Sequence, residues 1–128
     1  MFHLTALVTL LAIAFYFFTC MNVSRSRMKT GVKVPATSGH PDFDRAFRIQ
    51  MNTLEWMPIF LPALWLFAIY INDAIAAGIG AVWIIGRIVY FIGYSKAAAK
   101  RGTGFAIQGL AAIVLWAGAL GAVVLRLV

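Results

Sequence analysis

The sequence contains few charged residues and very few acidic ones. Asp and Glu number 4 among 128 residues, and all charged residues make up 12% of the chain, where a soluble domain has about 25%. The single cysteine, Cys20, excludes an intramolecular disulfide framework, and no cysteine-rich cluster predicts a metal site. Hydrophobic residues make up 62% of the chain, too many for so short a chain to bury in one core. We therefore expect lipid to be its main solvent.

Long apolar runs divide the chain into four predicted membrane spans within one domain, 1–128. The first run, from Phe2 to about Met21, contains no Asp, Glu, Lys or Arg and can cross a hydrocarbon core of about 30 Å. It does not resemble a secretory signal, because no basic segment precedes it. Short connections favour an antiparallel all-α bundle. The predicted spans are about 2–22, 43–70, 74–95 and 104–126, with one polar loop at about 24–42.

Lys and Arg number 11, which gives a formal net charge of +7. In a soluble protein this excess would suggest a nucleic-acid partner, but here the cations lie in the connections, so we expect no nucleic acid. By the positive-inside rule, the loop 24–42 and the third connection, with Lys96, Lys100 and Arg101, face the cytoplasm. Both termini would then face the other side of the membrane, and the basic loops would contact anionic lipid.

Ionisable residues inside a span are costly in lipid, so they usually face the bundle interior and find partners. Arg48, Asn52 and Glu55 share one helix face. Arg48 and Glu55 could simply neutralise each other, and tyrosines near helix ends are common interface anchors. The combined array suits a small zwitterion, since arginine binds carboxylates and glutamate accepts from an ammonium group. The third helix and its exit carry a similar polar stripe: Arg87, Tyr90, Tyr94 and Arg101.

These residues resemble a known family. The pattern Arg-x-x-x-Asn-x-x-Glu-x-x-Pro, formed by Arg48, Asn52, Glu55 and Pro58, resembles the second-helix signature of the MAPEG superfamily, the membrane-associated proteins of eicosanoid and glutathione metabolism. The segment 86–94, followed by Arg101, is similar to the third-helix signature. With four spans of matching length, the resemblance covers nearly the whole chain.

The resemblance implies a homotrimer that holds glutathione between neighbouring subunits near the cytoplasmic helix ends. Arg101 matches the arginine that stabilises the glutathione thiolate. Trp56 is a departure, because the glutathione-conjugating branch often has tyrosine there. Arg25 falls near a further family arginine, and Arg87 is left between ligand contact and helix packing. The positions that match glutathione-binding residues are Arg27, Arg48, Gln50, Asn52, Glu55, Tyr90 and Tyr94.

The expected function is that of a membrane-bound glutathione S-transferase. A thiol with a pKa of about 8.5 reacts as its thiolate, and a guanidinium can favour that anion. The thiolate would attack a lipophilic electrophile or reduce a lipid hydroperoxide. One alternative is a non-catalytic lipid-binding scaffold of the same family. A small four-helix transporter is disfavoured, because the polar groups crowd one membrane face instead of forming a relay through the bilayer.

Overall fold

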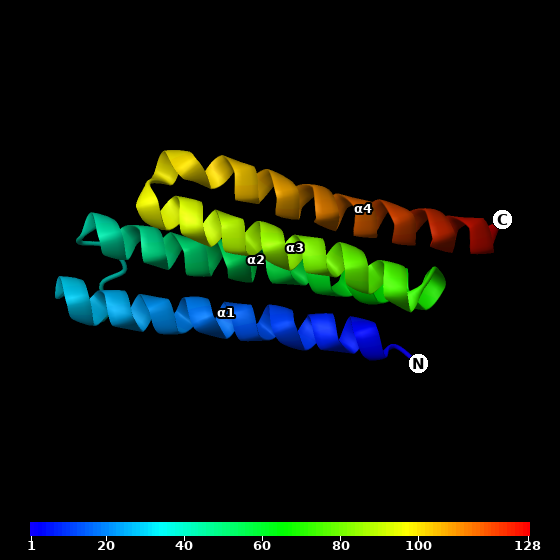
Figure 1. The fold of residues 1–128 in the computed structure, drawn as a ribbon, viewed down its shortest axis with the longest axis horizontal. Helices are drawn as coiled ribbons and strands as arrows, with labels where there is room; N and C mark the ends of the chain where they lie inside the picture. Colours follow the sequence, from blue (N-terminus) through cyan, green and yellow to red (C-terminus); the bar gives the residue numbers. More distant parts are fainter.

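The computed structural model describes all residues, 1–128, as an all-helical bundle. The helices are α1 (His3–Thr30), α2 (Pro41–Tyr70), α3 (Asp73–Lys96) and α4 (Gly102–Leu127), with a short 3₁₀-helix η1 (Ala98–Arg101) before α4. They run side by side along the long axis, and both termini lie at the same end (Figure 1). All four are long and apolar enough to cross a membrane. The predicted four-helix membrane bundle is confirmed.

Helix α1 extends well past its apolar run. It stays helical to Thr30, so the polar connection predicted over 24–42 is non-helical only over 31–40. The residues after Met21 are mostly polar, but none of them before Gly31 is a helix breaker. Gly31 ends the helix with a left-handed φ of 77°, and its N–H donates to the carbonyl of Arg27, as in a common C-terminal cap. The basic end of α1 therefore projects as an ordered helix.

The next two helices begin with side-chain caps. The imidazole Nδ1 of His40 accepts from the N–H of Asp42, and Pro41 occupies the first helical turn of α2. Asn72 caps α3 by accepting from the N–H of Ile75 at 2.9 Å. Such caps satisfy N–H groups that have no partner within the helix. They explain why α2 and α3 begin close to the predicted positions.

Small residues let α3 and α4 approach closely. A Cβ on Gly104 would lie 2.1 Å from the backbone nitrogen of Tyr90, and a Cβ on Gly86 would lie 2.6 Å from that of Gln108. A side chain at either glycine would push the two helices apart. This close packing fixes the third helix against the start of the fourth, which is where the candidate site lies.

The bundle buries a modest apolar core and leaves its outer surface apolar. Phe60 of α2 stacks on Trp83 of α3 with ring centroids 3.9 Å apart, and both are fully buried. Large hydrophobic residues such as Leu10, Phe17 and Leu110 remain about half exposed or more. An outer surface of this kind suits a lipid environment.

The end of the bundle that carries the termini is tied by polar contacts. The carboxylate of Asp73 accepts from the backbone N–H groups of Thr5 at 2.9 Å and Leu4 at 3.3 Å, so the start of α3 caps the start of α1. Arg126 donates to the carbonyl of Tyr70 at 3.2 Å. These contacts hold the helix ends together at the end of the bundle that lies opposite the basic connections.

Candidate functional site

A polar cavity of about 530 Å³ opens at the end of the bundle that carries the basic connections. Three helices and η1 build it, because α2 and α3 run antiparallel and α4 begins beside the end of α3. Of the residues predicted from the sequence, five line it. Its lining consists of Arg48, Asn52, Tyr90, Tyr94, Arg101 and Phe105.

Arg101 reaches the cavity because the chain folds back tightly after α3. A Cβ on Gly93 would lie 2.2 Å from the carbonyl oxygen of Lys100, so only glycine lets η1 pack this closely on the last turns of α3. The Nη1 of Arg101 donates to the carbonyl of Ala98 at 2.6 Å, and its guanidinium lies 5.8 Å from the ring centre of Tyr94. Arg101 is exposed and faces no carboxylate, so its positive charge is available to a ligand.

Arg48, which lines the cavity, forms an ion pair with Glu55, which lies outside the lining. Their side chains approach to 3.6 Å and remain 51% and 54% exposed. An exposed pair at this distance contributes little to stability, about 0–1 kcal/mol. A purely structural role therefore explains the pair poorly. Each group can leave its partner and bind a ligand instead.

Arg87 lies beneath the cavity and is fully buried. It donates to the Oδ1 of Asn52 at 2.8 Å and to the hydroxyl of Thr53 at 2.6 Å, and its guanidinium lies 4.4 Å from the ring centre of Tyr90. No carboxylate pairs with it. Within this chain, Arg87 thus orients Asn52 by a hydrogen bond and packs against the ring of Tyr90, and both of these residues line the cavity.

The contact with Arg87 determines what Asn52 can offer. Because its carbonyl oxygen accepts from Arg87, its amide nitrogen is left as a donor without a partner in the chain. An exposed amide donor suits a carboxylate or a peptide carbonyl. The tyrosine phenols add further groups, with the rings of Tyr90 and Tyr94 packed edge to face at 5.4 Å.

Aromatic rings form one wall of the cavity. Phe105, on the first turn of α4, packs edge-on against Trp56 at 5.6 Å and lies 6.1 Å from the ring of Tyr90. Phe105 is not among the residues predicted from the sequence, because no signal in the sequence distinguishes it from other apolar residues of α4. Trp56 supports this wall where a tyrosine would offer a hydroxyl group.

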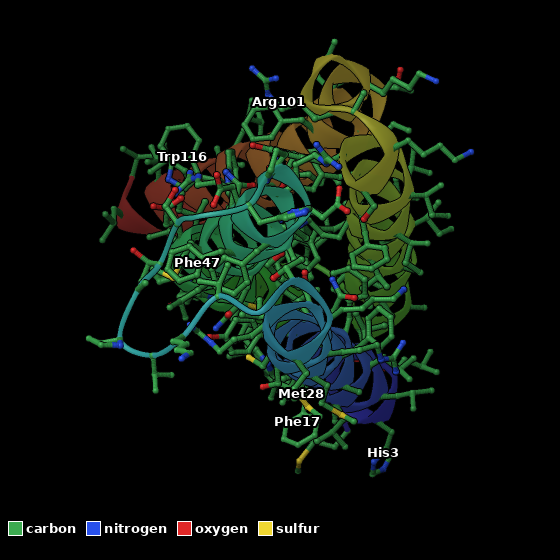
Figure 2. All side chains as sticks on the ribbon, turned by 90° about the vertical axis from the view of Figure 1, so that its left-hand side faces the viewer. His3, Phe17, Met28, Phe47, Arg101 and Trp116 are labelled. Carbon is green, nitrogen blue, oxygen red and sulfur yellow. The ribbon has the colours of Figure 1, made fainter.

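Two predicted residues lie away from the cavity. Arg27 donates to the carbonyl of Ala36 at 2.8 Å, and its guanidinium lies 4.6 Å from the ring centre of Phe43. Gln50 follows Arg48 by two positions, which places it about 200° further around α2. Figure 2 views the bundle from this end and shows Phe47 on the side of α2 that faces the connection 31–40, while Arg101 lies beside the start of α4. One chain therefore does not assemble the full predicted set.

Arg25 also stays outside the cavity and lines a separate pocket between α1, α2 and α3. Glu55 is connected to the cavity only through Arg48. A single chain thus presents two groups of predicted residues on opposite faces of α2. Arg27 and Gln50 form one group, and the residues around Arg48 and Arg101 form the other.

Comparison with known proteins gives this geometry a context. The chain matches the MAPEG family over residues 5–121. It is 53% identical over 115 residues to an uncharacterized protein of Synechocystis sp., covering 90% of this chain and 84% of that protein. It is also 42% identical over 119 residues to microsomal glutathione S-transferase 2 of Homo sapiens, covering 92% and 81% of the two chains.

A further relative is leukotriene C4 synthase of Cavia porcellus, which is 38% identical over 98 residues, covering 77% of this chain and 65% of that enzyme. The family match spans nearly the whole chain and includes all four helices. The residues that suggested the resemblance, Arg48, Asn52 and Glu55 on α2 and Tyr90 and Tyr94 on α3, lie within it. This chain belongs to the MAPEG family of integral membrane proteins.

Proposed function

We propose that this protein is a membrane-bound glutathione S-transferase that conjugates glutathione to lipophilic electrophiles. The observation that carries the proposal is the cavity in which Arg48 and Arg101 face the phenols of Tyr90 and Tyr94 at the basic end of the bundle. The names of the two enzymes to which the chain is similar, a microsomal glutathione S-transferase and leukotriene C4 synthase, support the same chemistry.

Glutathione carries two carboxylates, an ammonium group and a thiol, and the cavity offers a partner for each kind of group. The guanidinium of Arg48 can bind a carboxylate with two parallel hydrogen bonds, and Glu55 can accept from the ammonium group once Arg48 turns to the ligand. Asn52 supplies its free amide donor. In this assignment the Arg48–Glu55 pair opens on binding, at little energetic cost because both groups are half exposed.

Arg101 is assigned the stabilisation of the thiolate. Its guanidinium carries a positive charge and donates hydrogen bonds, so it favours the anionic sulfur over the thiol. The thiolate then attacks an electrophilic carbon, a carbon–sulfur bond forms, and the leaving group departs with its electron pair. With an epoxide, the ring oxygen takes the electron pair and is protonated by solvent.

The same thiolate can reduce a lipid hydroperoxide. One glutathione attacks the distal peroxide oxygen to form a sulfenic acid and release the lipid alcohol. A second glutathione then gives the disulfide and water. Both reactions need an oily reactant to reach sulfur at the membrane boundary, and the apolar wall of Trp56 and Phe105 offers such a reactant a compatible surface.

Complete glutathione binding is proposed to need a neighbouring copy of the chain, in a homotrimer. Within one chain, Gln50 lies on the side of α2 opposite Arg48, and Arg27 of α1 packs against Phe43 of α2 and does not line the cavity. A ligand between two subunits can contact Arg48 of one and Gln50 of the next. By the positive-inside rule, this end of the bundle faces the cytoplasm, where glutathione is the soluble partner. Membrane lipid surrounds the remaining surface.

The test is a glutathione titration of detergent-purified protein, followed at the ultraviolet absorption band of the thiolate. We expect saturable thiolate formation in the wild type, and its loss in Arg101→Ala with glutathione still bound. Lys100→Ala removes an adjacent exposed cation that does not line the cavity, and serves as the matched control. A wild type that binds no glutathione would favour the lipid-binding scaffold, and full turnover by Arg101→Ala would remove Arg101 from the mechanism.

A further inference from the structure

A second polar pocket lies at the same end of the bundle and shares no lining residue with the glutathione cavity. Its volume is about 290 Å³, and it lies between the last turns of α1, the first turn of α2 and the end of α3. Only one of its lining residues is hydrophobic. Its polar lining includes Asn22, Arg25, Ser26, Lys29, Arg45 and Ser95.

Positive charge in this pocket exceeds negative charge. The only carboxylate in its lining, Asp42, is bound to the guanidinium of Arg45. Arg25 and Lys29 lie four residues apart on α1 and form neither an ion pair nor a hydrogen bond within the chain. Like charges at this spacing repel each other. An anion between them would relieve that repulsion.

Helix dipoles account for only part of the excess positive charge in the pocket. Lys29 lies in the last turn of α1, where a cation offsets the partial negative charge of the helix end. Arg25 lies a turn earlier, beyond the range of that effect. Arg45 is held against Asp42, and its Nε is buried without an acceptor. Arg25 therefore remains without an intramolecular explanation, and the Nε of Arg45 remains without an acceptor.

Uncharged hydrogen-bond donors also line the pocket and could bind the oxygens of an oxyanion. The amide of Asn22 and the hydroxyls of Ser26 and Ser95 line the same pocket as the cations. Hydroxyl and amide groups donate to phosphate oxygens without adding charge. The combination of cations with short donors from two helices fits a phosphate group better than a simple halide ion.

An aromatic cluster lies one helical turn from the pocket, toward the membrane centre. The rings of Phe18 on α1 and Phe91 on α3 lie 5.2 Å apart, and Phe15 packs against both. Phe18 precedes Asn22 by one helical turn, and Phe91 precedes Ser95 by one turn. Phe18 is 44% exposed. An acyl chain attached to a phosphate in the pocket would therefore lie against apolar rings.

We propose that this pocket binds the phosphate headgroup of an anionic phospholipid, with an acyl chain packed against the rings of Phe15, Phe18 and Phe91. These aromatic rings favour a lipid over a free phosphate, which shares the headgroup chemistry but has no acyl chain to pack against them. The site is independent of the proposed glutathione chemistry, because the two pockets have separate linings.

Native mass spectrometry of the detergent-purified protein tests the proposal with added phosphatidylglycerol or phosphatidylcholine. We expect retention of phosphatidylglycerol over phosphatidylcholine by the wild type. Arg25→Gln/Lys29→Gln should lower phosphatidylglycerol affinity about thirtyfold, since two basic residues near the membrane surface are lost. Lys33→Gln/Lys96→Gln makes the same charge change at exposed positions outside the pocket and should retain binding. Equal loss in both double variants would overturn the proposal.

Two further measurements keep the test decisive if the Arg25 and Lys29 variant does not fold. A photoreactive phosphatidylglycerol analogue should crosslink to 15–29 or 91–95 of the wild type, and crosslinking confined to other segments would contradict the site. Glycerol phosphate should compete only weakly with the lipid. If it instead displaces phosphatidylglycerol at comparable concentration, the pocket is a free-phosphate site and the lipid assignment is wrong.

Discussion

Replacing Arg87 by methionine should weaken glutathione binding in the cavity lined by Arg48 and Arg101, while the stability of the bundle stays nearly unchanged. Arg87 is fully buried, has no carboxylate partner, and donates to Asn52 and Thr53 at 2.8 and 2.6 Å. Methionine has similar length and no charge. The substitution removes two charge-assisted hydrogen bonds but also removes the desolvation of a buried cation. Because hydrophobic replacement of buried charges is often neutral or stabilising, we expect the unfolding free energy to change by less than about 2 kcal/mol.

Glutathione binding should respond much more strongly to the same substitution. The hydroxyl of Thr53 keeps a partner, since it donates to the carbonyl of Ile49 at 2.7 Å. Asn52 loses the group that directs its amide donor into the cavity, and Tyr90 loses the cation beside its ring. Loss of one well-oriented hydrogen bond to a charged ligand group is worth about 1.5–3 kcal/mol. This corresponds to an affinity about ten- to a hundredfold weaker.

Calorimetric titration with glutathione, together with thermal unfolding in the same detergent, measures both quantities. Arg126→Met is the matched control, because Arg126 also lies beside a tyrosine ring and donates one hydrogen bond, but at the far end of the bundle. Arg126→Met should leave glutathione affinity unchanged. If Arg87→Met binds glutathione as the wild type does, or if both variants lose affinity equally, Arg87 does not orient the cavity.

Three other predictions probe separate parts of the structure. Arg48→Ala should weaken glutathione binding at least about tenfold by removing a charged hydrogen-bond donor; a titration showing wild-type affinity would rule out the carboxylate contact. Gly104→Ala places a Cβ 2.1 Å from the backbone nitrogen of Tyr90 and should lower both the thermal midpoint and glutathione affinity. Gly78→Ala is the control, because its Cβ would meet nothing within 4 Å, and it should be neutral or stabilising by up to about 1 kcal/mol. Equal behaviour of these two alanine variants would contradict the close approach of α4 to α3 at Gly104. Asp73→Ala leaves two backbone N–H groups of α1 without their acceptor and should lower the thermal midpoint with glutathione affinity intact, because position 73 lies at the opposite end of the bundle. A changed affinity would indicate coupling along the bundle.

The sequence by itself determined the four helices, their membrane setting and the family. These features depend on composition and local spacing, since long apolar runs must be helical in lipid and residues three or four apart share a helix face. The motif through Arg48, Asn52 and Glu55 could therefore be found without a structure. The extension of α1 to Thr30 was not predicted, because polar composition marks the end of a membrane span and not the end of a helix.

Only the tertiary structure decided which of these residues meet. Arg87 was ambiguous in sequence, and its hydrogen bonds to Asn52 and Thr53 depend on how α3 is rotated against α2. Phe105 became part of the cavity because Gly93 and Gly104 let the chain pack tightly against α3. The roles assigned to the glutathione-binding residues and to Arg101 stay predictions. Helical periodicity orders residues around one axis, whereas a binding site depends on the rotation and separation of several axes, which small residues and buried polar contacts set together.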